Sequence, residues 1–214
     1  MGVTLVKELR EKTGAGLLDC QKALGDADGD LEKAVRILRE RGLAKAAKKS
    51  SRAATDGTVG SYIHPGGKIG VLIEVNCETD FVAKTSEFQQ LVRDLGMQVA
   101  AAAPRWVSRD EVPSSEVDNE RQIYRAQAKQ AGKPDNVLER IVEGQVERFY
   151  KDSCLLEQPF IKQSDRTVAE VVQEAIVRFG VNVAVRRFAR FQLGETLSRA
   201  SEAKEDAAGG TAGA

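Results

Sequence analysis

A change of hydrophobic period near Gly57 constrains this chain more than any other feature. Apolar residues alternate over residues 59–63 and again in a second run, where one face carries Ile69, Val71, Ile73, Val75 and Cys77. Residues 64–67, with the turn-forming sequence His-Pro-Gly-Gly, separate the two runs. A period of two is typical of strands with one buried face, so the pattern predicts an antiparallel hairpin.

The period returns to 3.6 residues directly after the hairpin. One helix face then carries Phe88, Leu91, Val92, Leu95 and Val99. Further helices are predicted near residues 115–131, 138–149 and 168–179, with a last strand over 181–193. A tight hairpin followed by helices predicts an α+β fold with a mostly antiparallel sheet.

The predicted last strand carries apolar side chains on both faces. Strict alternation places Val185 and Phe191 on one face and Phe188 on the other. A sheet covered by helices on one side ordinarily exposes polar residues on the other. The apolar surplus therefore indicates a second layer, and a homodimer joined through this sheet is the simplest source of one.

Three short apolar stripes precede the sheet, in residues 1–42. In the third, Asp30 can cap a helix, an i, i+3, i+4, i+7 pattern runs from Leu31 to Leu38, and Gly42 can end the helix in a left-handed conformation. The pattern predicts a three-helix domain. Because so short a segment has a small core, we expect it to be a docking domain attached to a larger one.

Composition marks the other boundaries. Residues 43–56 are predicted to be a basic linker, helical at most in part, and the cations in or beside it are Arg41, Lys45, Lys48, Lys49 and Arg52. Residues 57–197 are predicted to form the α+β core. Residues 198–214 consist largely of Ala, Gly and charged residues, which predicts a disordered tail.

Charge and cysteine content narrow the function. The chain has 32 Lys+Arg and 32 Asp+Glu, so a global positive field that would bind nucleic acid tightly is not expected. Its three cysteines are far apart in sequence, which suggests reduced thiols in a cytoplasmic protein. The first residues lack the apolar stretch of a signal peptide or membrane span, so no membrane association is expected.

Motifs for enzyme chemistry are incomplete. Asp26, Asp28 and Asp30 begin like a calcium loop, but Leu31 and Ile37 occupy the positions of its glycine and closing glutamate. The single histidine lies in the hairpin turn without a paired nucleophile. We therefore expect no enzymatic activity, metal or cofactor. The basic linker leaves an RNA-binding module open as an alternative.

The junction between the hairpin and the long helix has two interpretations. Phe81 can be a core residue below the helix, and Asp80 can be a cap or turn residue. Alternatively, the two residues form a tip that inserts an acid and an aromatic ring into a partner.

Two long motifs resemble the signatures of bacterial-type translation elongation factor Ts. Residues 9–24 read LREKTGAGLLDCQKAL, and residues 74–84 read EVNCETDFVAK. The similarity continues through LLEQPF at residues 155–160 and RRF at 186–188. Only the tail lies outside it.

This resemblance implies a guanine nucleotide exchange factor that promotes GDP release from elongation factor Tu during translation elongation. The N-terminal domain would be the family's ubiquitin-associated-like domain and would hold the partner through Leu9, Leu17 and Leu18. The family often has methionine at the last two positions.

The second motif implies a role in exchange itself. The residues that would intrude beside the partner's magnesium site and loosen GDP are Thr79, Asp80, Phe81 and Val82. Because this chain has about half of the core of longer members, the resemblance also implies that it acts as a homodimer.

Overall fold

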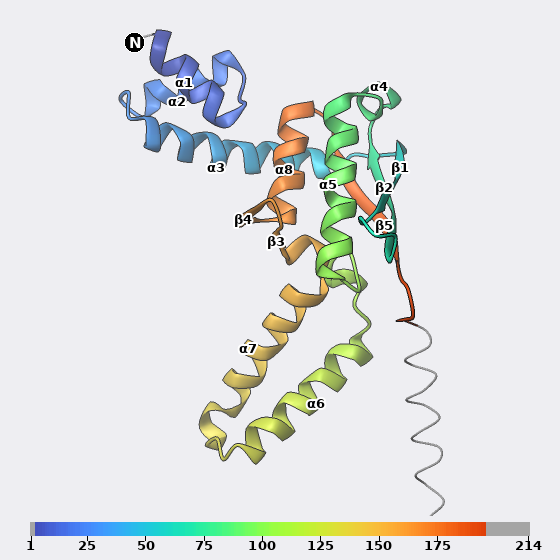
Figure 1. Ribbon diagram of the computed structural model, residues 1–214. Coiled ribbons are helices and arrows are strands. Elements are labelled where there is room, and N and C mark those ends of the chain that lie inside the picture. The colour runs from blue at the N-terminus through green and yellow to red at the C-terminus, as the bar shows by residue number, and fades with distance from the viewer. Residues whose placement is uncertain (1–2, 196–214) are drawn as a thin grey trace, which may run out of the picture.

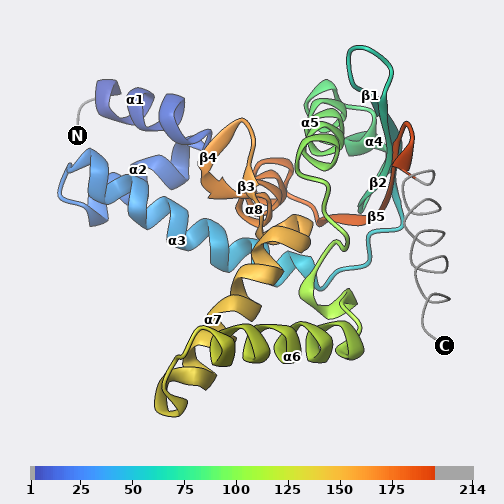
Figure 2. The same ribbon diagram turned by 60° about the horizontal axis from the view of Figure 1, so that its bottom comes forward.

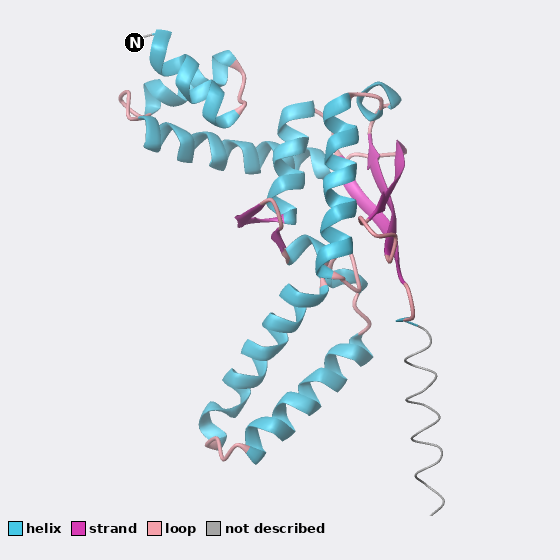
Figure 3. Cartoon of the chain, in the orientation of Figure 1, coloured by secondary structure: helices cyan, strands magenta, loops and turns pink. Residues whose placement is uncertain are grey.

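A computed structural model describes residues 3–195 of the chain. Figure 1 shows three parts: an N-terminal helical head, an α+β core, and a long helical hairpin that projects from the core. Figure 3 shows that helices dominate all three and that the main sheet lies at one edge of the core. The predicted tail, and residues 196 and 197 of the predicted core, lie outside the described residues.

The head consists of α1 (Val3–Thr13), α2 (Leu17–Asp26) and the first half of α3 (Leu31–Ser50). Its small core buries, among others, Leu9, Cys20, Leu24 and Ala34. As predicted, Asp30 caps α3, because its carboxylate accepts the backbone N–H of Lys33 at 2.9 Å. The expected three-helix arrangement is therefore confirmed.

The predicted end of the third helix at Gly42 is wrong. α3 continues as one helix of 20 residues to Ser50, so it includes most of the segment expected to be a linker. Its second half packs along α8 (Val168–Phe179), and Ala46 is buried in the main core. Alanines favour the helix, and packing against α8 outweighs the cost of one glycine. The boundary expected between residues 42 and 43 thus falls inside a helix.

The main sheet has three antiparallel strands in the order β1-β2-β5: β1 (Asp56–Ile63), β2 (Ile69–Cys77) and β5 (Val183–Gln192). The first two form the predicted hairpin. The predicted long helix is α5 (Ser86–Ala102), which packs across the sheet beside α8. Residues from the sheet and α5, including Ile73, Val75, Phe88 and Leu95, form the center of the core. These observations confirm the α+β prediction.

A β-bulge in β5 changes which of its side chains share a face of the sheet. Val185 pairs with Val75, whereas Phe188 pairs with Ile73, so Arg186 is the extra residue between them. Both partners on β2 are buried side chains of the core face. Phe188 therefore lies on the same face as Val185, and the predicted opposite facing of these two residues is wrong.

The other face of the sheet is apolar and exposed. Its large exposed side chains are Val59, Ile63, Leu72 and Phe191. Within residues 3–195, the helices that contact the main sheet pack against its opposite face. We call these four side chains the open sheet face.

The helical hairpin consists of α6 (Ser114–Gln130) and α7 (Asp135–Ser153). A small apolar cluster of Val117, Val142 and Val146 joins the two helices. At its root, the buried amide of Gln98 donates to the side-chain oxygen of Gln158 at 3.1 Å. The hairpin leaves the core at the end opposite α4 (Figure 1).

The remaining elements are short. They are α4 (Asp80–Ala83), the 3-10 turns η1 (Arg109–Glu111) and η2 (Leu155–Glu157), and a second antiparallel pair, β3 (Pro159–Phe160) with β4 (Gln163–Thr167). The sequence pattern did not predict this second pair. Among the helices of residues 3–195, none has the length and apolar character needed to cross a membrane.

Candidate partner-binding site

The segment of residues 79–82 forms an exposed tip where β2 turns into α4. Thr79 caps α4, because its hydroxyl oxygen accepts the backbone N–H of Val82 at 3.4 Å. The Phe81 side chain that follows is 79% exposed. For comparison, Phe88 on α5 is fully buried. Phe81 is therefore not a core residue, and its ring is free to contact another molecule.

Asp80 presents a negative charge beside this ring. The ammonium of Lys84, one helical turn later, donates to Asp80 Oδ2 at 2.7 Å. This hydrogen bond and the positive charge hold the pKa of Asp80 below its usual range and raise the pKa of Lys84. The tip thus offers an ionised carboxylate paired with the exposed Lys84.

The base of the tip is firmly held although its end is exposed. The thiol of Cys77 donates to the carbonyl oxygen of Thr79 at 3.1 Å, and burial raises the pKa of this thiol, so it stays protonated. The amide of Gln89 on α5 donates to the carbonyl oxygen of Ala83 at 2.6 Å. Contacts on both sides of α4 therefore hold the short backbone segment that carries Phe81.

A second exposed surface lies on the head. Leu17 and Leu18 begin α2, and their side chains are 52% and 70% exposed. Leu9, expected in the same contact surface, is fully buried below them in the core of the head. The structure therefore brings Leu17 and Leu18 to the surface, whereas Leu9 supports the domain from inside.

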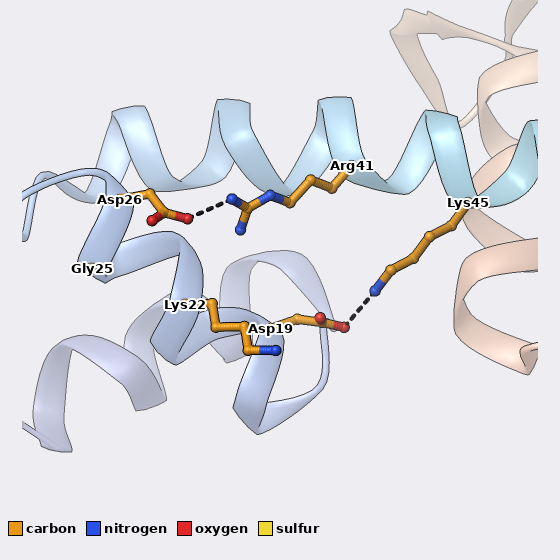
Figure 4. Close-up of a pocket in the computed structure, with 6 residues that line it drawn as sticks. All are labelled: Asp19, Lys22, Gly25, Asp26, Arg41 and Lys45. Carbon is orange, nitrogen blue, oxygen red and sulfur yellow. Dashed lines mark hydrogen bonds and ion pairs between the residues drawn. The ribbon is translucent and has the colours of Figure 1, made fainter.

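Two exposed ion pairs connect α2 to α3 beside this surface. Figure 4 shows the open pocket between the two helices, where Arg41 pairs with Asp26 and Lys45 pairs with Asp19 at 2.9 Å. Lys22, on α2, also lines this pocket. Because two charge pairs cross this pocket, we assign it a structural role in holding α2.

The structure does not bring the two surfaces together. The tip lies at the edge of the core, and the head lies at the far end of α3 (Figures 1 and 2). Between them lies a polar junction that the sequence analysis missed, formed by Arg52, Glu78 and Asn182. One signal could have revealed it: Asn182 interrupts the apolar run from Val181 to Val183.

Within the described residues, 3–195, no group of three or more His, Cys, Asp or Glu side chains could hold a metal ion. The tip and the head surface both present exposed apolar side chains, which is an arrangement suited to contact with a macromolecule.

Comparison with known proteins shows which family this chain belongs to. A family model described as Elongation factor TS matches residues 25–195, which include the tip. The chain is 58% identical over 198 residues to elongation factor Ts of Carboxydothermus hydrogenoformans, an alignment that covers 92% of this chain and 91% of the relative. It is 59% identical over 194 residues to elongation factor Ts of Geotalea uraniireducens, with coverages of 91% and 90%. The chain therefore belongs to the elongation factor Ts family of translation elongation factors.

Proposed function

We propose that this protein is a guanine nucleotide exchange factor for elongation factor Tu, acting in the cytoplasm during translation elongation. The observation that carries the proposal is the exposure of Phe81, at 79%, on a capped and buttressed tip. An exposed aromatic ring beside a carboxylate suits insertion into a partner. In this proposal the inserted segment is residues 79–82, with Asp80 directed toward the region of the partner's magnesium ion.

Exchange of this kind needs no covalent chemistry. A factor that binds nucleotide-free partner more tightly than GDP-bound partner weakens GDP by the same ratio, because the two binding equilibria are linked. Under this proposal the protein is not an enzyme in the strict sense and uses no cofactor. The Leu17 and Leu18 surface would hold the partner while the tip acts.

The open sheet face supports a homodimer as the working unit. Four large apolar side chains on one flat sheet surface are costly to leave in water. A two-fold axis through this face would bury them against the same four residues of a second copy. The proposed dimer contact involves neither the tip nor the Leu17 and Leu18 surface, so both remain available.

The alternative of an RNA-binding module has less support. Of the five cations in the basic segment, four have partners within the chain: Arg41 with Asp26, Lys45 with Asp19, Lys49 with the Gly180 carbonyl and Arg52 with Glu78. Cations already paired attract phosphates less strongly than free ones. The ion pairs therefore favour a structural role for this segment.

Release of labelled GDP from elongation factor Tu tests the proposal. We expect the full chain at micromolar concentration to accelerate release in a saturable manner. A filter-binding measurement with a generic RNA, repeated at two salt concentrations, tests the alternative in parallel. Absence of any acceleration, together with salt-sensitive RNA binding, would replace the exchange proposal with the RNA-binding one.

A further inference from the structure

The carboxylate of Glu78 connects the tip to two distant parts of the chain. Glu78 directly precedes Thr79, which caps α4. One of its oxygens accepts the backbone N–H of Asn182 at the start of β5, and the other lies 3.6 Å from the guanidinium of Arg52. The side chain of Glu78 is only 21% exposed, so these contacts are partly shielded from solvent.

Asn182 binds the end of α3 through its side chain. Its buried amide nitrogen donates to the carbonyl oxygens of Ser50 at 3.2 Å and Arg52 at 2.6 Å. These carbonyls lie where α3 ends, a position at which backbone acceptors lack partners within the helix. The ammonium of Lys49 also donates to the carbonyl oxygen of Gly180. The end of α3 is thus attached to the segment that leads into β5.

The junction therefore links the end of α3 to the segment that carries the tip, in addition to the packing of α3 along α8. The N-terminal half of α3 belongs to the head, although its Arg39 pairs with Glu170 of α8, and the C-terminal half lies along α8. A helix of 20 residues transmits the direction of its fixed end to its free end over about 30 Å. A small rotation at the junction would displace the Leu17 and Leu18 surface relative to Phe81.

We propose that Glu78 and Asn182 are positioning residues that fix the head relative to the tip, so that both surfaces engage one partner molecule at once. This inference rests on the proposed exchange function. Once the head has bound, the tip acts at an effective concentration set by the geometry of the connection. Misplacement by about 1 Å can reduce the rate of a positioned step by as much as about a hundredfold. Neither residue needs to touch the partner.

A purely structural role would produce a different kinetic result. Loss of folded protein lowers the active fraction, which raises the apparent half-saturating concentration and leaves the maximal rate of GDP release unchanged. Loss of positioning lowers the maximal rate itself, because the head still binds through Leu17 and Leu18 while the tip is misplaced. The two effects separate when release is measured over a range of factor concentrations.

The test compares two substitutions at one position. Glu78→Gln keeps an acceptor for the Asn182 N–H, whereas Glu78→Ala removes both contacts. We expect Glu78→Ala to lower the maximal rate about tenfold or more with little change in half-saturating concentration, and Glu78→Gln to stay within about twofold of wild type. Asn182→Asp should resemble Glu78→Ala, because it places a carboxylate against two carbonyl oxygens. Glu139→Ala, which removes an exposed pair with Arg125, is the matched control.

A distance measurement tests the same inference without the partner. Spin labels are placed on Glu32→Cys in the head and on Lys68→Cys in the exposed turn between β1 and β2, and the labelled protein is diluted with unlabelled chain. We expect a narrow distribution of distances between the two labels. It should broaden in Glu78→Ala and not in Glu78→Gln. A wild-type maximal rate and an unchanged distribution in folded Glu78→Ala would overturn the proposal. If the wild-type chain releases no GDP, the exchange function fails, and the distance distribution alone then decides whether the junction positions the head.

Discussion

Val185 and Phe188 point to the same side of β5 although they are three positions apart in sequence. The bulge at Arg186 produces this relationship, and it places Phe188 instead of Phe191 on the face that carries Val185. Phe188 packs against the core, whereas Phe191 is 66% exposed on the open sheet face. Substitutions at the two positions should therefore have different consequences.

Replacement of Phe191 by Asp should break the proposed homodimer and leave the monomer folded. A charge at this exposed position costs little in the monomer but would have to be buried in the dimer. By light scattering at micromolar concentration, we expect the wild-type mass to be twice the monomer mass of 23.2 kDa and the variant mass to be that of one chain. A wild-type monomer with full exchange activity would contradict the dimer.

Phe188→Asp tests the phenylalanine on the core face of β5. Because Phe188 packs on the core face, the charge should lower the free energy of unfolding and the cooperativity of the thermal transition. Circular dichroism distinguishes this loss of fold from the loss of dimer. An equally stable Phe188→Asp protein would show that the bulge does not place this ring inside.

Replacement of Phe81 by Ala should reduce exchange and spare the fold. Burying a phenylalanine in the partner is worth about 1.5 to 3 kcal/mol, and about 1.4 kcal/mol corresponds to a factor of ten. We therefore expect GDP release to slow about tenfold, with an unchanged thermal transition because the ring is exposed in the free chain. Phe88→Ala is the contrast, with a stability loss of about 3 to 5 kcal/mol from its fully buried position. Unchanged release by folded Phe81→Ala would remove the tip from the mechanism.

Substitutions in the head should separate affinity from stability. Leu17→Ala combined with Leu18→Ala removes exposed apolar surface, so we expect weaker binding to elongation factor Tu with little change in head stability. Leu9→Ala creates a cavity and should cost about 2 to 5 kcal/mol of stability. Calorimetric titration measures the affinity, and denaturant unfolding measures the stability. Equal affinity in the double variant would show that this surface is not a contact.

The three cysteines should resist modification in the folded protein. All are buried, and burial, with the nearby charge of Glu157, raises the pKa of Cys154 from 9.0 to about 11. The reactive thiolate fraction at pH 8 is therefore about a hundredfold lower than for an ordinary thiol. Mass spectrometry after maleimide treatment should show no rapid labelling of the folded chain and three labels in denaturant. Rapid labelling of the folded chain at Cys154 would contradict its burial.

Hydrophobic period predicted the regular parts of this structure and missed features that depend on distant contacts. The hairpin and α5 follow from local patterns that any half-buried strand or helix shows. The bulge adds Arg186 to the strand, and nothing in the pattern of apolar and polar residues marks this extra residue. Strict alternation therefore assigned Phe188 to the wrong face. The continuation of α3 past Gly42 depends on α8, more than a hundred residues later.

The sequence likewise predicted only part of the candidate site. The motifs identified the tip and the exposed pair on the head, but they also grouped Leu9 with residues that the fold places on the surface. The interrupted apolar run marks Asn182 as unusual but does not reveal its partners, which are the backbone carbonyls of residues 50 and 52. Backbone acceptors leave no trace in the residue types of a sequence.

The hairpin of α6 and α7 should unfold locally more readily than the core does. Its few shared apolar contacts and its exposed ion pairs, which are worth about 0 to 1 kcal/mol each, stabilise it far less than the core stabilises β2. Local openings of low free energy occur where buried apolar contacts are few. Backbone amides of the hairpin should therefore exchange their hydrogens with deuterium long before those of β2. Within residues 3–195, a protease should cut the hairpin before it cuts the core.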